Sequence, residues 1–121
     1  MNYIEIKTIL SNISDPVEKL EFVMDMGKNL PPIPDGCAAT EIRGCASRVD
    51  LCRSPENHYY GSADSALVRG IVAILLSAAD GKNPAEIRSI NLRHEFESLN
   101  LNLGAGRMNG VDSMIGWLED N

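Results

Sequence analysis

The sequence has few aromatic residues and fewer basic than acidic ones. Aromatic residues make up only 5% of the 121 positions, so the core must be built from Ile, Leu, Val, Met and Ala. The 11 Lys and Arg residues are outnumbered by 17 Asp and Glu, which gives a net charge of −6. Proteins that bind nucleic acid without regard to sequence need a basic surface. We therefore expect no nucleic-acid partner.

The sequence also has no apolar run long enough for a membrane helix. Its longest such run, "ALVRGIVAILLSAA", is too short for a bilayer and contains Arg69. The first residues, "MNYIEIKTILSNISDP", show neither the basic region nor the apolar stretch of a signal peptide. We expect a cytoplasmic protein with no membrane partner. In that compartment the three cysteines are expected to be free thiols or ligands rather than disulfides.

Hydrophobic spacing predicts helices at both ends of the chain. Residues 3–13 carry apolar residues at helical spacing, and Asp15 followed by Pro16 is typical of the start of a second helix. Another cap is expected at Asn83, and a final helix over residues 107–119. The long run quoted above predicts a helix buried on all sides, capped by Ser62 or Asp64. The expected buried face of the second helix comprises Val17, Leu20, Met24 and Gly27.

Three short stretches between these helices read as strands: "TEIR", "SRVDLCR" and "HYYGS". In the second, Val49 and Leu51 share one face, with Arg48, Asp50 and Cys52 on the other. The connections are short, which favours an antiparallel meander. The expected fold is α+β, a small three-stranded antiparallel sheet packed with helices, in a single domain over residues 1–121.

Cys45 is the candidate reactive residue. It lies in a predicted loop after Gly44, a residue that lets a partner's backbone approach closely. Arg43 and Arg48 are near it in sequence, and positive charge stabilises the nucleophilic thiolate. A free cysteine is more often a small buried apolar residue. The residues alone leave both interpretations open.

Two other kinds of site have weaker support. No C-x-x-C pair is present, so a metal site would require Cys37, Cys45 and Cys52 to converge in space. A nucleophilic hydrolase would need Cys45 beside His58 or His94. The glycines of "GAGRMNG" follow no clear strand and are a weak signal for a phosphate loop.

Four blocks of the chain resemble the SufE/CsdE family of sulfur acceptors, in the same order. They are the cysteine segment "IRGCASRV", the helix and proline-marked exit "DPVEKLEFVMDMGKNLPPIP", the long-helix segment "GSADSALVRGIVAILLSAADGKNPAEI" and the final "LNLGAGRMNGVDSMIGWL". The resemblance implies an α+β fold with a three-stranded antiparallel sheet. It also implies that Cys45 accepts sulfur from the persulfide of a cysteine desulfurase.

The resemblance further implies the partners. They are a SufS/CsdA-like cysteine desulfurase, which the protein would stimulate, and an iron–sulfur scaffold complex that receives the sulfur; a homodimer is included among the expected assemblies. Pyridoxal phosphate would belong to the desulfurase, so we expect this chain to bind neither a cofactor nor a metal. Its role would be that of a sulfur carrier and activator rather than of an ordinary enzyme.

The family pattern also suggests residues that support the cysteine loop. They are Gly44, Ser47, Arg43, Arg48 and Arg107. Asp50 departs from the pattern, because the family commonly has tryptophan there, and Cys37 and Cys52 are additional thiols. The alternative is an IscU-like iron–sulfur or zinc scaffold, which has a related fold and would use all three cysteines.

Overall fold

The computed structural model describes residues 1–120, which form six helices and three strands. The helices are α1 (Tyr3–Ser11), α2 (Pro16–Gly27), α3 (Ala66–Ala79), α4 (Pro84–Ser89), α5 (Leu92–Glu97) and α6 (Ala105–Asp120). The strands are β1 (Thr40–Glu41), β2 (Val49–Arg53) and β3 (Tyr59–Ala63). Within this described part, no helix is both long and apolar enough to cross a membrane.

The sheet is antiparallel, with β2 between β1 and β3. Leu51 of β2 lies opposite Thr40 on one side and Gly61 on the other. The predicted three-stranded antiparallel meander is confirmed. β1 has only two residues, so the sheet is short on that side of β2, and the chain before and after β1 forms loops.

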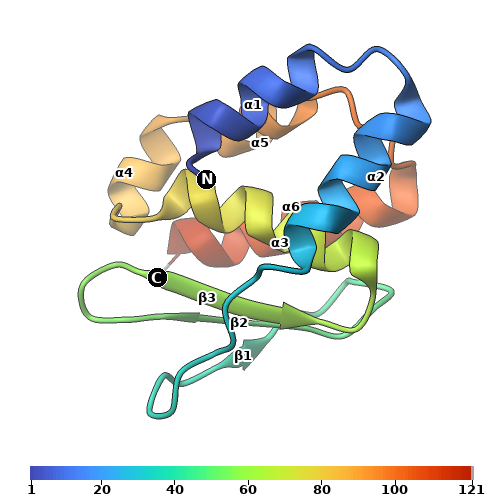
Figure 1. Ribbon diagram of the computed structural model, residues 1–121. Helices are drawn as coiled ribbons and strands as arrows, with labels where there is room; N and C mark the ends of the chain where they lie inside the picture. Colours follow the sequence, from blue (N-terminus) through green and yellow to red (C-terminus); the bar gives the residue numbers. More distant parts are fainter. Residues whose placement is uncertain (121) are drawn as a thin grey trace.

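The helices gather on one face of the sheet (Figure 1). The central helix is α3, which contacts β3 as well as α1, α2, α5 and α6. Since α3 has neighbours on several sides, apolar residues around most of its circumference are buried, as the sequence predicts. The expected α+β class is confirmed.

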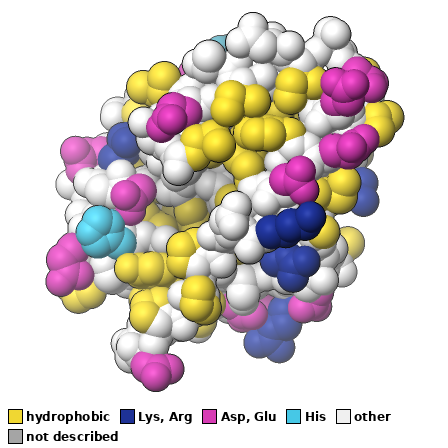
Figure 2. Space-filling view, viewed as in Figure 1, with side chains coloured by type: hydrophobic (Ala, Val, Ile, Leu, Met, Phe, Trp, Pro, Cys, Tyr) yellow, Lys and Arg dark blue, Asp and Glu magenta, His cyan; other side chains and the backbone are white. Residues whose placement is uncertain are grey.

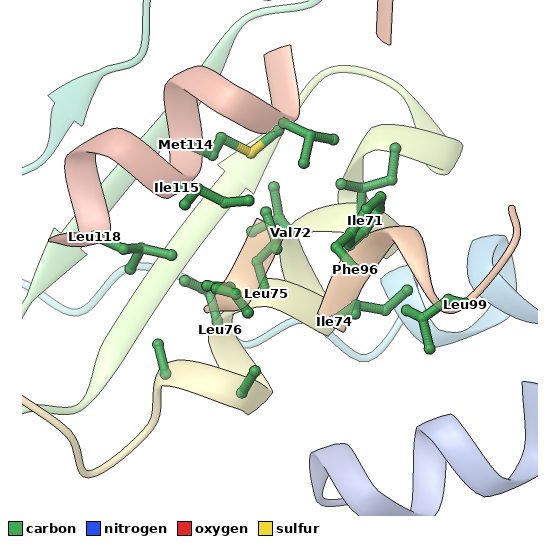
Figure 3. Close-up of a cluster of buried hydrophobic side chains, with 14 of the residues drawn as sticks. Ile71, Val72, Ile74, Leu75, Leu76, Phe96, Leu99, Met114, Ile115 and Leu118 are labelled. Carbon is green, nitrogen blue, oxygen red and sulfur yellow. The ribbon is translucent and has the colours of Figure 1, made fainter. Parts of the chain in front are cut away.

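A cluster of apolar side chains joins α6 to α3 (Figure 3). In this view Met114, Ile115 and Leu118 extend from α6 toward α3. Leu75 of α3 and Leu118 are each only 1% exposed. Burying a side chain of this size contributes about 1.5–3 kcal/mol, so this cluster holds α6 firmly against the rest of the core.

The contact between α2 and α3 depends on two glycines. A Cβ atom on Gly27 would lie 2.6 Å from the backbone nitrogen of Gly70. A Cβ atom on Gly70 would overlap the backbone oxygen of Val23. The two backbones can approach this closely only because both positions lack a side chain.

Local sequence sets the starts of two helices as predicted. The Asp15 side chain accepts a hydrogen bond from the Val17 N–H, and Pro16 occupies the first turn of α2. Asn83 and Glu86 form a reciprocal capping box at the start of α4. Both predicted caps are confirmed.

The expected faces of α2 and β2 are partly wrong. Val17 is 62% exposed, and the buried residues of α2 are Val23 and Gly27, because the glycine contact with α3 sets which side faces inward. Cys52, expected on the polar face of β2, is fully buried. A disulfide joins it to Cys37 in the loop after α2, and this loop therefore lies against Cys52.

Candidate functional site

The loop of residues 42–48 joins β1 to β2 and carries Cys45. Its two ends are held together by a hydrogen bond of 2.8 Å from the Ile42 N–H to the Val49 carbonyl oxygen. Ile42 and Val49 are both buried, so this base is anchored in the core. Gly44 has a φ of +91°, in the left-handed region that glycine adopts without steric cost. The loop therefore turns sharply just before Cys45.

Cys45 is half-buried in this conformation. Its thiol donates a weak hydrogen bond to the Gly110 carbonyl oxygen of α6, with 3.7 Å between sulfur and oxygen. Burial raises the pKa of the Cys45 thiol, because removing water disfavours the charged thiolate. The resting thiol is therefore held mainly in its protonated, less nucleophilic form.

A hollow of about 350 Å³ opens beside the cysteine. Its walls are apolar. They are formed by Val68 and Ile71 of α3, by Leu103 in the loop before α6, and by Met114 of α6. These walls make part of the surface around the sulfur apolar. The hollow is also large enough to take in more than the thiol itself, since one water molecule occupies about 30 Å³.

Two of the predicted supporting residues line this hollow. Ser47 lies on the loop, and Arg107 lies near the start of α6 with its side chain exposed. The structure thus brings together residues that are distant in sequence, as the family pattern suggested. It places the exposed residue Arg107 beside the same hollow as Cys45.

The other two arginines do not act on the resting thiol as expected. Arg48 donates to both carboxylate oxygens of Asp50, with nitrogen–oxygen distances of 3.0 and 3.3 Å, and Asp50 raises the pKa of Arg48. Arg43 is exposed. The cause of the shift in the Cys45 pKa is burial, and the shift is upward. The expected lowering of this pKa by Arg43 and Arg48 is therefore wrong for this position of the loop.

Asp50 thus has a definite partner. At this position the family commonly has tryptophan. In this chain Asp50 forms an ion pair with Arg48 and lies between Glu41 and Ser62 in the sheet. The surface next to the cysteine loop is consequently polar.

The expected cap of α3 is also wrong. Ser65, rather than Ser62 or Asp64, begins the helix by accepting a hydrogen bond from the Val68 N–H at 3.1 Å. The Asp64 backbone N–H instead donates to the Arg48 carbonyl oxygen at 3.2 Å. This bond follows the last β2–β3 residue pair, Val49 and Ala63, and α3 begins beyond it.

The expectation of three free cysteines is contradicted. Cys37 and Cys52 form a disulfide with 6.1 Å between their Cα atoms, and Cys45 is the free cysteine of the described residues. The two bonded sulfurs are not available to a metal. Residues 1–120 also hold no group of three or more Cys, His, Asp or Glu side chains that could bind one. The structure therefore does not support the scaffold alternative.

The hydrolase alternative lacks its histidine. His58 forms an ion pair of 2.9 Å with Asp80 at the end of α3, and this carboxylate raises the pKa of His58. Cys45 instead lies beside Ser65 and Val68 at the opposite end of the same helix. The hollow beside Cys45 has no histidine among its described lining residues.

Sequence reasoning missed the contact between Cys45 and Gly110. The signal for it was available, because a glycine inside a helix weakens the helix and often marks a close approach. The segment "GAGRMNG", considered above as a weak phosphate loop, ends with this glycine. In the structure Gly104 precedes α6, and Gly106 and Gly110 lie within it.

A larger hollow lies on another face, between α1, α3 and the loop after α2. It measures about 600 Å³ and includes Ile6, Met26 and Leu76. Figure 2 shows apolar side chains grouped on the face of the molecule that is turned to the viewer in Figure 1. None of the described residues that line this hollow is a cysteine or an arginine. Size therefore does not identify the site, because the smaller of these two hollows holds the free thiol.

Comparisons with known proteins agree on one family. Residues 4–121 match the domain described as "SufE: Fe-S metabolism associated domain". An uncharacterized SufE-like protein of Rhizobium meliloti (strain 1021) is 35% identical over 109 residues, which cover 81% of this chain and 78% of that protein. The sulfur acceptor protein CsdE of Escherichia coli (strain K12) is 33% identical over 105 residues, covering 80% of this chain and 71% of CsdE.

A solved structure has the same fold with little sequence identity. The solution structure of a hypothetical protein from Thermus thermophilus has a TM-score of 0.78 and 11% identity. The match covers 97% of this chain and 90% of the other. At this identity the likeness concerns the fold alone.

Proposed function

The chain belongs to the SufE family, and from this premise we propose that it accepts sulfur on Cys45 from the persulfide of a cysteine desulfurase. The sulfur would then pass to an iron–sulfur scaffold complex. The observation that carries the proposal is the free thiol of Cys45, which lies on a loop beside an apolar hollow rimmed by Arg107.

The proposed transfer follows the chemistry of thiol–disulfide exchange. Cys45 loses its proton to solvent, and its thiolate attacks the outer sulfur of the donor's persulfide. A new sulfur–sulfur bond forms on Cys45, the bond within the donor persulfide breaks, and the donor cysteine leaves as a thiolate. Atoms and electrons balance without any further oxidant or reductant. Pyridoxal phosphate remains with the desulfurase in this scheme.

The environment of Cys45 supports a carrier that reacts only with its partner. In the resting position burial raises the pKa of the thiol, so it reacts slowly with small molecules. When a partner draws the loop outward, this effect of burial is lost and the thiolate becomes accessible. On return, the apolar hollow would shield the persulfide from water, oxidants and other thiols.

The arginines have a place in the open state. Arg43 and Arg48 are exposed on the loop itself, and Arg107 is exposed at the rim of the hollow. Positive charge here favours both the attacking thiolate and the anionic persulfide that it forms. We therefore assign them to the open loop, where the burial that dominates at rest is absent.

The proposal is tested by trapping the transferred sulfur. The protein is incubated anaerobically with a cysteine desulfurase and L-cysteine, and adducts are mapped by mass spectrometry. We expect one added sulfur on Cys45, its loss in Cys45→Ser, and faster desulfurase turnover with the wild-type protein. Cys37→Ser serves as a control that keeps the adduct on Cys45. If a panel of SufS/CsdA-like desulfurases gives neither an adduct nor faster turnover, the proposal fails.

A further inference from the structure

Cys45 rests directly on a helix position that has no side chain. A Cβ atom placed on Gly110 would lie 3.1 Å from the Cys45 sulfur, 3.5 Å from its Cα and 3.6 Å from its Cβ. The sulfur is the closest of these atoms. The thiol thus occupies space that any other residue at position 110 would partly fill.

The neighbouring loop residue shows the same close approach. A Cβ atom on Gly44 would lie 2.7 Å from the Ser113 hydroxyl oxygen, one turn further along α6. Two consecutive loop residues therefore contact the helix, and at each contact one of the two partners lacks a Cβ. The hydrogen bond from the thiol to the helix is weak, at 3.7 Å, so close packing is the main restraint on the sulfur.

From these contacts we propose that Gly110 is a positioning residue for sulfur transfer, which sets the balance between the closed and open positions of Cys45. This inference rests on the proposed function of Cys45. A glycine within a helix costs stability relative to alanine. At position 110 that cost is offset by the closed position of the cysteine, which the missing Cβ allows.

The proposal predicts that two steps of the carrier's cycle, loading and loss of sulfur, both become faster when Gly110 is replaced. Alanine at position 110 would crowd the closed position and leave the open one untouched, because the open loop no longer contacts the helix there. Cys45 would then accept sulfur faster, since its thiol is exposed for more of the time. Its persulfide would also be lost faster to small thiols, since the hollow shelters it for less of the time.

The first test measures Cys45 alone. Alkylation by iodoacetamide is followed from neutral to alkaline pH in wild type, Gly110→Ala and Gly116→Ala. The last variant is the matched control, because it makes the same change in the same helix and a Cβ there would meet no described atom within 4 Å. Gly110→Ala is expected to react about threefold faster at neutral pH, because the thiol spends more time free of the burial that raises its pKa. Its pH midpoint should fall accordingly, while Gly116→Ala matches wild type.

The second test checks that the effect passes through the sulfur. Thermal melting is compared for Gly110→Ala and Gly116→Ala in the wild-type and Cys45→Ala backgrounds. We expect Gly110→Ala to melt below Gly116→Ala only when Cys45 is present, because without the sulfur the nearest atom lies at an ordinary contact distance. A difference that persists in Cys45→Ala overturns the proposal, and so does an unchanged alkylation profile.

Neither test involves a desulfurase. If sulfur transfer fails in the trapping experiment, the alkylation and melting results can still be interpreted. If the alkylation or melting test fails, the trapping experiment still tests the proposed function. In the transfer assay itself, Gly110→Ala should load faster than wild type and lose its sulfur to added glutathione faster. A change in only one of these two rates would contradict the proposed balance.

Discussion

The proposed function requires a single residue, Cys45, to be unreactive at rest and nucleophilic when a partner is bound. Both properties follow from where the sulfur lies. Burial against α6 raises the pKa of the thiol, and the arginines that would lower it are exposed or, for Arg48, paired with Asp50. A modest movement of the loop would remove the burial and leave the positive charges in place.

The pH dependence of Cys45 alkylation follows from this burial. The folded protein stabilises the neutral thiol, so the midpoint of the alkylation rate should lie above that of the same chain unfolded in urea with its disulfide intact. The same shift stabilises the fold below the unfolded pKa, and this contribution disappears as the pH rises through the folded pKa. Alkylation followed by mass spectrometry in both states gives the two midpoints. A folded midpoint equal to or below the unfolded one would show that the arginines already dominate at rest.

At the scale of elements, glycines occur at two places where segments of the chain pack closely against each other. Gly27 and Gly70 let α2 approach α3, and Gly110 lets the cysteine loop approach α6. The two contacts differ in what a Cβ would meet. At Gly70 it would overlap the α2 backbone at Val23, whereas at Gly110 the nearest atom is the side-chain sulfur of a loop residue. The contact at Gly70 therefore stabilises the packing of α2 on α3, whereas the contact at Gly110 can be relieved by a movement of the loop.

Gly70→Ala is accordingly expected to destabilise the protein strongly. The new Cβ overlaps the Val23 backbone, so α2 must shift away from α3 and lose part of its buried contact. Overpacking of this kind costs about 1–3 kcal/mol and occasionally more, and we expect the upper end of that range in urea unfolding. Gly116→Ala, where a Cβ meets no described atom within 4 Å, should instead gain up to about 1 kcal/mol from helix propensity. Equal midpoints for the two variants would contradict the contact described here.

At the scale of the whole molecule, one covalent link encloses the functional loop. The disulfide joins Cys37, ahead of β1, to Cys52 in β2, and the 15-residue separation between them includes Cys45. The link ties the loop that leaves α2 to the central strand of the sheet. The base of the cysteine loop is thereby held on both sides.

Reduction of this disulfide should lower the free energy of unfolding. Closing a loop of about 15 residues in the unfolded chain is worth about 3 kcal/mol, mainly as lost chain entropy. Urea unfolding with and without a phosphine reductant should show a loss of about 2–3 kcal/mol in wild type and in Cys45→Ser. Cys37→Ser cannot form the link and should not respond to the reductant. If wild type does not respond either, the link does not contribute to stability.

The sequence alone determined most of the helices and strands and pointed to Cys45 as the candidate reactive residue. Helix periodicity, the caps at Asp15 and Asn83, and alternating strand residues depend on near neighbours, so they can be read locally. The resemblance of four blocks pointed to Cys45 and to the family, which the comparisons then showed.

Tertiary structure alone decided the environment of Cys45. Three features of this environment depend on how α6, the sheet and the loops pack together. They are the disulfide, the ion pair of Arg48 with Asp50, and the contact of the Cys45 sulfur with Gly110. The pKa of a thiol depends on its burial and on the charges near it in space. Spacing along the chain shows neither, so it predicted a lowered pKa for Cys45, whereas burial raises that pKa.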